Sequence, residues 1–147
     1  MKILIINGPN LNFLGIREPS VYGSKTYDDL TNFLNQEGSK RNINLDIRQT
    51  NHEGLIIDYI QEAYFNKYDG IIINPGGYTH YSVAIRDAIS SVMIPTIEVH
   101  LSNILEREDF RKISLIKDVC VKSIYGKGFD GYLEALEYFY KKENQHE

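Results

Sequence analysis

The sequence predicts an α/β fold in which a parallel sheet of short strands is covered by helices on both faces. Two observations carry this prediction. Apolar segments short enough to be strands alternate with segments whose apolar residues recur at helical spacing, a pattern typical of parallel βαβ units. Several apolar segments also end abruptly in small and polar residues, as strands of an open parallel sheet do at a ligand site. The predicted strands cover residues 3–6, 45–49, 70–73, 96–99 and 119–124.

The first strand is followed by an unusually long connection. Residues 8–25 contain several Pro and Gly residues together with Arg17 and Tyr22. Connections between a strand and a helix in a compact domain are normally much shorter, and long loops at a ligand edge often close over the ligand. We therefore expect residues 8–25 to form a lid.

Four amphipathic segments are predicted to be the helices. The first begins after Thr26, because Asp28 and Asp29 complete a capping-box-like start that suits the helix dipole. In all four segments the apolar residues recur three and four positions apart, so each helix would present one stripe to the core. The stripes are Tyr27, Leu30, Phe33 and Leu34; Leu55, Ile56, Tyr59, Ile60 and Ala63; Val83, Ala84, Ala88 and Ile89; and, after Gly131, Tyr132, Leu133, Leu136 and Phe139.

The remaining strands complete the sheet. The third strand contains Ile71, Ile72 and Ile73, an uninterrupted apolar run that indicates burial on both faces, and Pro75 ends it. The fifth strand contains Cys120, which we expect to be a buried core thiol. With these connections the sequence predicts a flavodoxin-like, doubly wound five-stranded sheet with strand order 2-1-3-4-5 and helices on both faces.

Length and composition predict a single domain, residues 1–147, with a frayed tail at about residues 141–147. The 16 basic and 20 acidic side chains give a net charge of -4 without any block rich in Lys and Arg, which argues against a nucleic-acid partner. A single cysteine excludes an intrachain disulfide and a multi-cysteine metal site. The apolar run near the N-terminus is too short for a signal peptide or a membrane span. We therefore expect a cytoplasmic protein with no membrane partner.

The most unusual chemistry of the chain lies where three predicted strands end. In the order 2-1-3-4-5, strands 1, 3 and 4 are neighbours, so the segments that leave their carboxyl ends converge at one edge of the sheet. These segments are Asn7-Gly8-Pro9-Asn10, Asn74-Pro75-Gly76-Gly77 and His100-Leu101-Ser102-Asn103. Amides, glycines and an imidazole at the same edge predict a ligand site there.

Arg17 and Tyr22 of the long loop form a candidate acid–base pair. A tyrosine hydroxyl has an ordinary pKa of about 10 and is a poor base at neutral pH, but a nearby guanidinium favours the phenolate and lowers that pKa. Arg17 could therefore make Tyr22 a general base. A plain exposed surface loop is the alternative interpretation.

Glu98 and His100 lie two residues apart on a predicted strand, so both side chains project from the same face. There the carboxylate can orient the imidazole and favour its protonated form, which makes His100 a candidate general acid. The alternative is a hydrogen-bonded structural pair. His80 follows the third strand and faces the same edge. The three side chains could also bind a metal ion, but their spacing does not match the recognised zinc patterns, and no metal is predicted.

Other residues near this edge could bind an anion or a hydroxyl group. Arg107 and Arg111 are four residues apart, and Arg111 could clamp a carboxylate. Ser102 could add a hydroxyl or a backbone donor to the same anion. Asp87, on the helix after the third strand, could bind a substrate hydroxyl or only a surface partner. The chain has no dinucleotide glycine fingerprint and no phosphate loop of the Lys-Ser/Thr type, so its glycines at this edge are a weak signal by themselves.

Taken in order, the motifs of the chain resemble type II 3-dehydroquinate dehydratase from end to end. Each motif is modest alone, but their order and spacing over nearly the whole chain make the resemblance specific. The motifs are Asn7-Gly8-Pro9-Asn10-Leu11, Arg17-Glu18-Pro19 with Tyr22-Gly23, residues 49–54, residues 74–80, residues 97–103, residues 107–111, and Gly126-Lys127-Gly128 with Gly131-Tyr132.

The resemblance implies a flavodoxin-like fold and a shikimate-pathway lyase that converts 3-dehydroquinate to 3-dehydroshikimate and water. It implies an enolate intermediate, no cofactor, no Schiff base, and a homododecamer built from trimers. Tyr22 would be the base that abstracts the proton, Arg17 the essential loop arginine, and His100 the proton donor to the departing hydroxyl. Asn10 would stabilise the enolate through an ordered water. The implied substrate-binding residues are Asn74, His80, Asp87, Leu101, Ser102 and Arg111.

Two other functions remain open. One is a non-catalytic module that binds a small anion on the same fold and uses Tyr22 only as part of a lid. The other is an FMN-binding protein, against which the absence of a Ser/Thr-rich phosphate loop after the first strand argues. The chain departs from the family pattern at Lys112-Ile113-Ser114, where a more polar, often His-containing stretch is expected. This departure concerns packing near Arg111 rather than the reaction.

Overall fold

The structure, a computed structural model, describes residues 1–145 apart from the side chain of Tyr22. It confirms the predicted sheet, in which all neighbouring strands are parallel and the order is β2-β1-β3-β4-β5. The strands are β1 (Lys2–Asn7), β2 (Asn44–Gln49), β3 (Gly70–Asn74), β4 (Thr96–His100) and β5 (Lys122–Tyr125). Connecting parallel neighbours requires crossovers, and the helices supply them.

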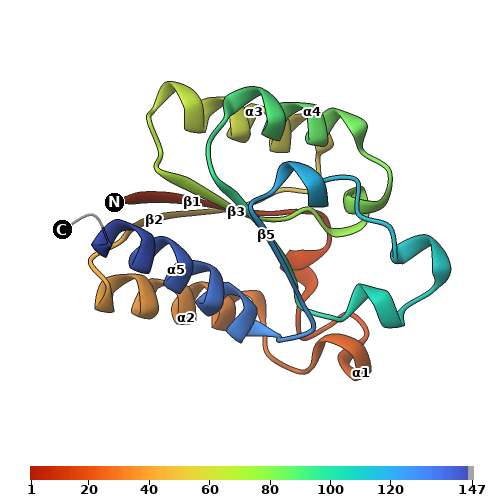
Figure 1. Ribbon diagram of the computed structural model, residues 1–147. Helices are drawn as coiled ribbons and strands as arrows, with labels where there is room; N and C mark the ends of the chain where they lie inside the picture. Colours follow the sequence, from red (N-terminus) through yellow and green to blue (C-terminus); the bar gives the residue numbers. More distant parts are fainter. Residues whose placement is uncertain (146–147) are drawn as a thin grey trace.

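Helices cover both faces of the sheet, as Figure 1 shows. Helices α2 (Tyr27–Lys40) and α5 (Phe129–Asn144) lie together on one face, and α3 (Glu53–Phe65) and α4 (Val83–Val92) lie on the other. The short helix α1 (Pro19–Tyr22) lies at one end of the molecule, within the predicted lid. The connections also contain short 3-10 turns, which are η1 (Leu11–Phe13), η2 (Gly76–His80), η3 (Ile104–Glu106), η4 (Asp109–Arg111) and η5 (Lys117–Val119).

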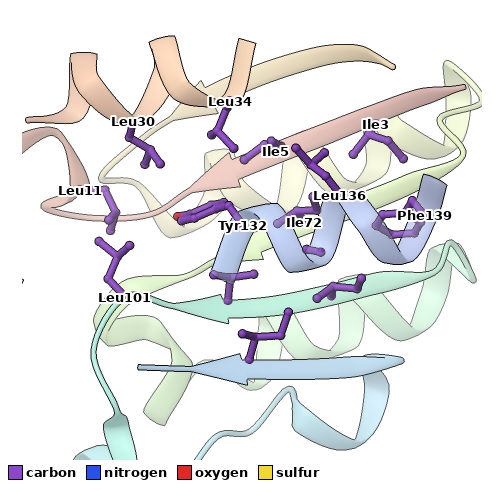
Figure 2. Packing of buried hydrophobic residues seen from close by; sticks show 14 of the residues in the cluster. Ile3, Ile5, Leu11, Leu30, Leu34, Ile72, Leu101, Tyr132, Leu136 and Phe139 are labelled. Atoms are coloured by element: carbon purple, nitrogen blue, oxygen red, sulfur yellow. The ribbon is translucent and has the colours of Figure 1, made fainter. Parts of the chain in front are cut away.

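The core has two halves because the strands are apolar on both faces. Along β1, Ile3 and Ile5 pack with α2 and α5, whereas Leu4 and Ile6 pack with α3 and α4. Alternate side chains of a strand point to opposite faces, so an uninterrupted apolar run fills both halves. Figure 2 shows the half that contains Leu30 and Leu34 of α2 and Leu136 and Phe139 of α5.

The predicted start of the first helix is confirmed. The hydroxyl of Thr26 accepts a hydrogen bond from the amide of Asp29, at 3.1 Å, and the Asp29 carboxylate accepts one from the amide of Thr26, at 2.8 Å. Two amide groups that the helix itself leaves without partners are thereby satisfied.

Two details of the predicted elements are wrong. The last strand begins at Lys122 rather than at residue 119, because the amides of Val119 and Cys120 bond to the carbonyl of Ile116 and form a 3-10 turn. Val83 and Ala84 are exposed at the start of α4, and the buried residues of that helix are Ile85, Ala88, Ile89 and Val92.

The helices differ from the predicted stripes at their edges as well. Leu55 is exposed, and Leu133 is only half-buried, because each lies at the margin of its helix rather than above the sheet. Helix α5 continues to Asn144, so residues 141–144 of the expected frayed tail are helical, while residues 146 and 147 lie outside the described part. Within residues 1–145, no helix combines the length and the apolar character that crossing a membrane requires.

Candidate active site

A cavity of about 180 Å³ opens at the carboxyl ends of β1, β3 and β4, the edge at which the sequence predicts a ligand site. Loops from these three strands, the predicted lid and the segment around η3 and η4 form its walls. The lining residues are Pro9, Asn10, Leu11, Leu14, Arg17, Asn74, Gly76, Gly77, His80, His100, Leu101, Ser102, Ile104, Arg107 and Arg111.

Close backbone contact holds the ends of β1 and β3 together below the cavity. The amide of Gly8 donates a 2.8 Å hydrogen bond to the carbonyl of Asn74. A Cβ atom added to Gly8 would lie 2.7 Å from the carbonyl carbon and oxygen of Pro75. Only glycine permits this approach, so it brings the loops after β1 and β3 to the same wall of the cavity.

Glu98 and His100 form a hydrogen-bonded pair at the end of β4. Glu98 is fully buried, and its Oε2 lies 2.6 Å from Nε2 of His100. Two serine hydroxyls complete the coordination of the carboxylate: Ser114 donates to Oε2 at 2.6 Å and Ser123 donates to Oε1 at 2.7 Å. Because Nε2 of His100 is committed to Glu98, Nδ1 is the ring nitrogen that can serve a ligand in the cavity.

The environment keeps Glu98 ionised. Burial by itself raises the pKa of this carboxyl, but the hydrogen bonds from His100, Ser114 and Ser123 outweigh burial and hold the pKa below its ordinary value. The carboxylate, 2.6 Å from Nε2 of His100, also fixes the orientation of that ring. The pair therefore presents Nδ1 of an oriented imidazole to a ligand.

His80 lines the cavity from the end of η2. Its Nδ1 lies 2.8 Å from the carbonyl of Ile113, so Nδ1 carries a proton and donates it, and Nε2 is left for a ligand. Burial lowers the pKa of His80, and the neighbouring His100 and Arg111 lower it further. The uncharged imidazole of His80 is therefore suited to forming hydrogen bonds with a ligand, and not to supplying a proton at neutral pH.

Arginines dominate the charge of the cavity. Arg17 reaches it from the lid, and Arg107 and Arg111 reach it from the segment after β4; among the described residues that line it, none is Asp or Glu. Arg107 also donates to the Ser102 hydroxyl, at 3.2 Å, and Arg111 forms an ion pair with Glu108, at 2.8 Å. Guanidinium groups and a serine hydroxyl suit a carboxylate on the ligand.

Hydrogen bonds hold the backbone of one asparagine of the site and the side chain of the other. Asn10 has a left-handed backbone, with φ of 69°, and its backbone amide donates to Oδ1 of Asn51 at 3.1 Å. Asn74 binds the Gly76 amide through Oδ1 at 3.2 Å and the Tyr132 hydroxyl through Nδ2 at 3.3 Å. Both line the cavity.

The structure thus brings together nearly all residues that the sequence singles out. Asp87 is not among the lining residues, because its side chain is exposed on α4. Tyr22 is the last residue of α1, and its side chain lies outside the described part of the structure. Within the described residues, no group of three or more His, Cys, Asp and Glu side chains is arranged to hold a metal ion.

Sequence reasoning overlooked several residues of the site. Ser123 could have been found from the strand order, because it is the partner of Glu98 in the β4–β5 register and a hydroxyl is what a buried carboxylate needs. Ser114 had no such signal, since it arrives from an irregular segment. The apolar wall formed by Leu11, Leu14 and Ile104 was also not predicted.

Comparisons with known proteins identify the family of the chain. The family model described as class II dehydroquinase matches residues 1–140. A 3-dehydroquinate dehydratase of Clostridium acetobutylicum is 58% identical over 136 residues, which cover 92% of this chain and 94% of the relative. A second relative of the same name, from Fusobacterium nucleatum, is 53% identical over an alignment that covers 99% of this chain and 100% of the relative.

A solved structure shows the same likeness in three dimensions. The type II dehydroquinase from Butyrivibrio crossotus superposes with a TM-score of 0.93 at 58% identity, covering 94% of this chain and 96% of that one. The family model and the relatives span nearly the whole chain, including all the loops that line the cavity. The chain therefore belongs to the class II dehydroquinases and is an enzyme of that family.

Proposed function

We propose that the chain catalyses the shikimate-pathway dehydration of 3-dehydroquinate to 3-dehydroshikimate through an enolate, by acid–base chemistry alone. The observation that carries this proposal is the Glu98–His100 pair, which presents an imidazole to a cavity lined by arginines. The membership of the family and the curated relatives named 3-dehydroquinate dehydratase identify the substrate.

The first step is removal of the proton beside the ketone. Tyr22 is the base, and the positive charge of Arg17 favours its phenolate form. The electron pair of the broken C–H bond moves onto the ketone oxygen and forms the enolate. Asn10, acting through an ordered water, stabilises that oxygen, as donors in an oxyanion hole do. Arg17 lies at the cavity, on the lid that also carries Tyr22, which supports this assignment.

The second step is loss of water. The enolate reforms the ketone, the new carbon–carbon double bond forms, and the bond to the departing hydroxyl breaks. The proton on His100 goes to that hydroxyl, which leaves as water, while Glu98 keeps the ring oriented throughout. Each of the two proton transfers contributes about 10²- to 10⁴-fold to the rate.

The other cavity residues hold the substrate. The backbone amides of Leu101 and Ser102 and the Ser102 hydroxyl receive the carboxylate, and Arg111 neutralises it. Asn74 and His80 bind ring hydroxyls. Asp87 also binds a hydroxyl in this proposal, although in a single chain it lies away from the cavity.

The reaction uses no Schiff base. A Schiff-base mechanism requires a lysine at the reacting carbon, and among the described residues that line the cavity there is no lysine. Sodium borohydride added during turnover should therefore leave the chain unlabelled, and a covalent substrate adduct on a lysine would disprove this part of the proposal.

A turnover assay tests the proposed reaction. Purified chain mixed with 3-dehydroquinate, without added metal, should generate the ultraviolet absorbance of a conjugated enone. The Tyr22→Phe and Arg17→Ala variants should fold normally and turn over far more slowly. Binding without turnover would favour a small-anion-binding module instead, and a purified protein coloured by flavin would favour an FMN protein.

We also propose that the protein is cytoplasmic and assembles as a homododecamer built from trimers. Light scattering coupled to size-exclusion chromatography should give about twelve times the 17.0 kDa mass of one chain. A mass of one chain, unchanged at high protein concentration, would contradict the proposed assembly.

A further inference from the structure

A buried polar network lies directly beneath the cavity, and it joins residues from β1, β3, α2 and α5. Asn7 at the end of β1 and Asn74 at the end of β3 are direct partners in the strand register. Both point to the face of the sheet that α2 and α5 cover, where Tyr132 is fully buried. Figure 2 shows the Tyr132 ring with its hydroxyl on the side of Leu11 and Leu101, two residues that line the cavity.

Hydrogen bonds connect these residues in a chain. The Tyr132 hydroxyl donates to Oδ1 of Asn7 at 2.6 Å and accepts from Nδ2 of Asn74 at 3.3 Å. Nδ2 of Asn7 lies 3.4 Å from the hydroxyl of Tyr27 on α2. Burial raises the pKa of Tyr132, so its hydroxyl keeps its proton and continues to donate at every physiological pH.

The bond made by one backbone group reveals the direction of every bond in this chain. The amide of Gly76 can only donate, and it donates to Asn74 at 3.2 Å, so the atom that it meets is Oδ1. Nδ2 of Asn74 must then face Tyr132, and the tyrosine oxygen must accept. The hydroxyl proton of Tyr132 is thereby directed to Oδ1 of Asn7, and Nδ2 of Asn7 is left to bond to the Tyr27 hydroxyl.

The same reasoning shows what Asn74 offers to the cavity. A reversed side-chain amide would place Nδ2 against the Gly76 amide, donor against donor, and would leave the Tyr132 hydroxyl oxygen facing Oδ1. In the observed orientation one hydrogen of Nδ2 is used by Tyr132, and the other remains for a ligand. Asn74 is nearly fully buried, so a wrong orientation would not be rescued by water.

We propose that Tyr132 and Asn7 are positioning residues that hold the side-chain amide of Asn74 as a hydrogen-bond donor to the ligand. The residues do not touch the ligand themselves. Given the proposed function, on which this inference rests, the group recognised is the oxygen of a ring hydroxyl of 3-dehydroquinate. The role is one of substrate binding, because no charge develops at that hydroxyl during proton abstraction.

Removing the tyrosine hydroxyl tests the proposal. The Tyr132→Phe variant should raise KM for 3-dehydroquinate about tenfold and leave kcat nearly unchanged, the signature of a binding interaction lost equally in ground and transition states. Asn74→Ala should show the same split. In the double variant KM should rise no further than in Asn74→Ala, since the hydroxyl acts only through that amide.

A matched control separates positioning from general stability. Tyr68 is also buried and donates its hydroxyl to Asp46 at 2.7 Å, but it lies on the other face of the sheet. Tyr68→Phe should therefore destabilise the fold without changing KM. Asn7→Ala provides an independent route, because it frees the Tyr132 proton, removes the directional constraint and should raise KM as Tyr132→Phe does.

The outcomes distinguish this inference from the proposed function. Wild-type protein without turnover would reject the proposed function. Crystal structures of the Tyr132→Phe and Asn7→Ala variants would then decide the inference. It requires that the Asn74 side-chain amide no longer has a single orientation in these variants. Unchanged KM in folded Tyr132→Phe and Asn7→Ala, or additive effects in the double variant, would overturn it. If neither variant folds, a wild-type crystal structure in which Nδ2 of Asn74 lies beyond hydrogen-bonding distance of Tyr132 would overturn it equally.

Discussion

The carboxylate of Glu98 is charged and fully buried, so the fold must stabilise it in place of water. Removing a carboxylate from water is costly unless hydrogen bonds replace the lost hydration. His100, Ser114 and Ser123 supply those bonds from three different segments. At the scale of the residue, the proton chemistry of the site depends on keeping this one group ionised and satisfied.

Removal of one of these donors should destabilise the protein in a pH-dependent way. Ser123→Ala leaves Oε1 of Glu98 without its hydroxyl partner, so the free energy of unfolding at pH 7 should fall by about 1–3 kcal/mol. The folded-state pKa of Glu98 is lowered, so its stabilising contribution is present above the ordinary value of 4.5 and is lost as the pH falls through the folded-state value. The difference between the variant and the wild type should therefore shrink on acidification.

Urea unfolding at pH 7 and at a series of lower pH values measures this effect. Ser91→Ala is the control, because it removes an exposed serine hydroxyl that bonds only to the carbonyl of Asp87. It should change stability by less than about 0.5 kcal/mol at any pH. A destabilisation by Ser123→Ala that does not vary with pH would show that the hydroxyl does not serve the ionised carboxylate.

Loss of the His100 imidazole should separate binding from chemistry. His100→Ala should reduce kcat by about 10²- to 10⁴-fold, the usual contribution of a general acid, with little change in the affinity for 3-dehydroquinate. Single-turnover kinetics and calorimetric titration measure the two quantities. His52→Ala, at an exposed histidine that does not line the cavity, should match the wild type in both. A His100→Ala variant with wild-type kcat would require another proton donor.

The elements show how closely the loops after β1 and β3 must approach to build one wall. Gly8 and Gly54 give a matched pair of sites for testing this. A Cβ at Gly8 would collide with the backbone of Pro75, whereas a Cβ at Gly54, in α3, meets nothing within 4 Å. Gly8→Ala should destabilise the fold by about 1–3 kcal/mol, and Gly54→Ala should stabilise it by about 0.5–1 kcal/mol.

Chemical denaturation of both variants measures these changes. Gly8→Ala should also raise KM, because its clash pushes on the turn that carries Asn74 and Gly76, and Gly54→Ala should not. Equal stability of the two variants would mean that the contact below the cavity can relax without cost.

The elements also show what the sequence can and cannot predict. The strands followed from Ile71-Ile72-Ile73 and similar runs, because burial on both faces demands continuous apolar residues. Their order followed from the helical connections between them. Residues 119–121 misled the strand prediction: their β-branched composition favours a strand, but Val119 and Cys120 instead pack against the α4 side of the core from a turn. Tertiary packing overrode local propensity there.

The residues of the candidate site likewise divide into those that the sequence could predict and those that it could not. His100 and Asn74 were predicted because they follow apolar strands directly, and strand ends are placed by the sheet. Ser114 comes from the irregular segment after β4, and no local pattern records the contact that it makes with Glu98. Asp87 was predicted as a site residue, but its side chain is exposed on α4 and does not line the cavity. Its position on a helix does not reveal whether the side chain reaches the cavity of its own chain.

At the scale of the whole molecule, local and net charge have opposite signs. The chain carries a net charge of -4, yet three arginines line the cavity. The field that a small anion meets near the cavity is therefore set by these local guanidinium groups, not by the total. In the proposed function, these arginines attract the carboxylate of the substrate into the site.

Salt should weaken this attraction. Raising the ionic strength from about 0.01 M to 0.5 M shortens the screening length from roughly 30 Å to less than 10 Å, so KM for 3-dehydroquinate should rise severalfold. The value of kcat should change little, because it is measured with the substrate already bound in the site. Initial rates in NaCl test this expectation, with sucrose at matched osmolality as the control. A KM that is flat across this range would show that the arginines act only at contact distance.

Three consecutive residues after η4 each bond to a different part of the site. The Ile113 carbonyl binds His80, the Ser114 hydroxyl binds Glu98, and the Leu115 amide donates to the carbonyl of Thr79 at 3.0 Å. Surface segments usually tolerate insertions and deletions. Here a single-residue insertion between η4 and Ile113 would displace all three partners in one step, so natural length variation should be absent from this segment even where its side chains differ.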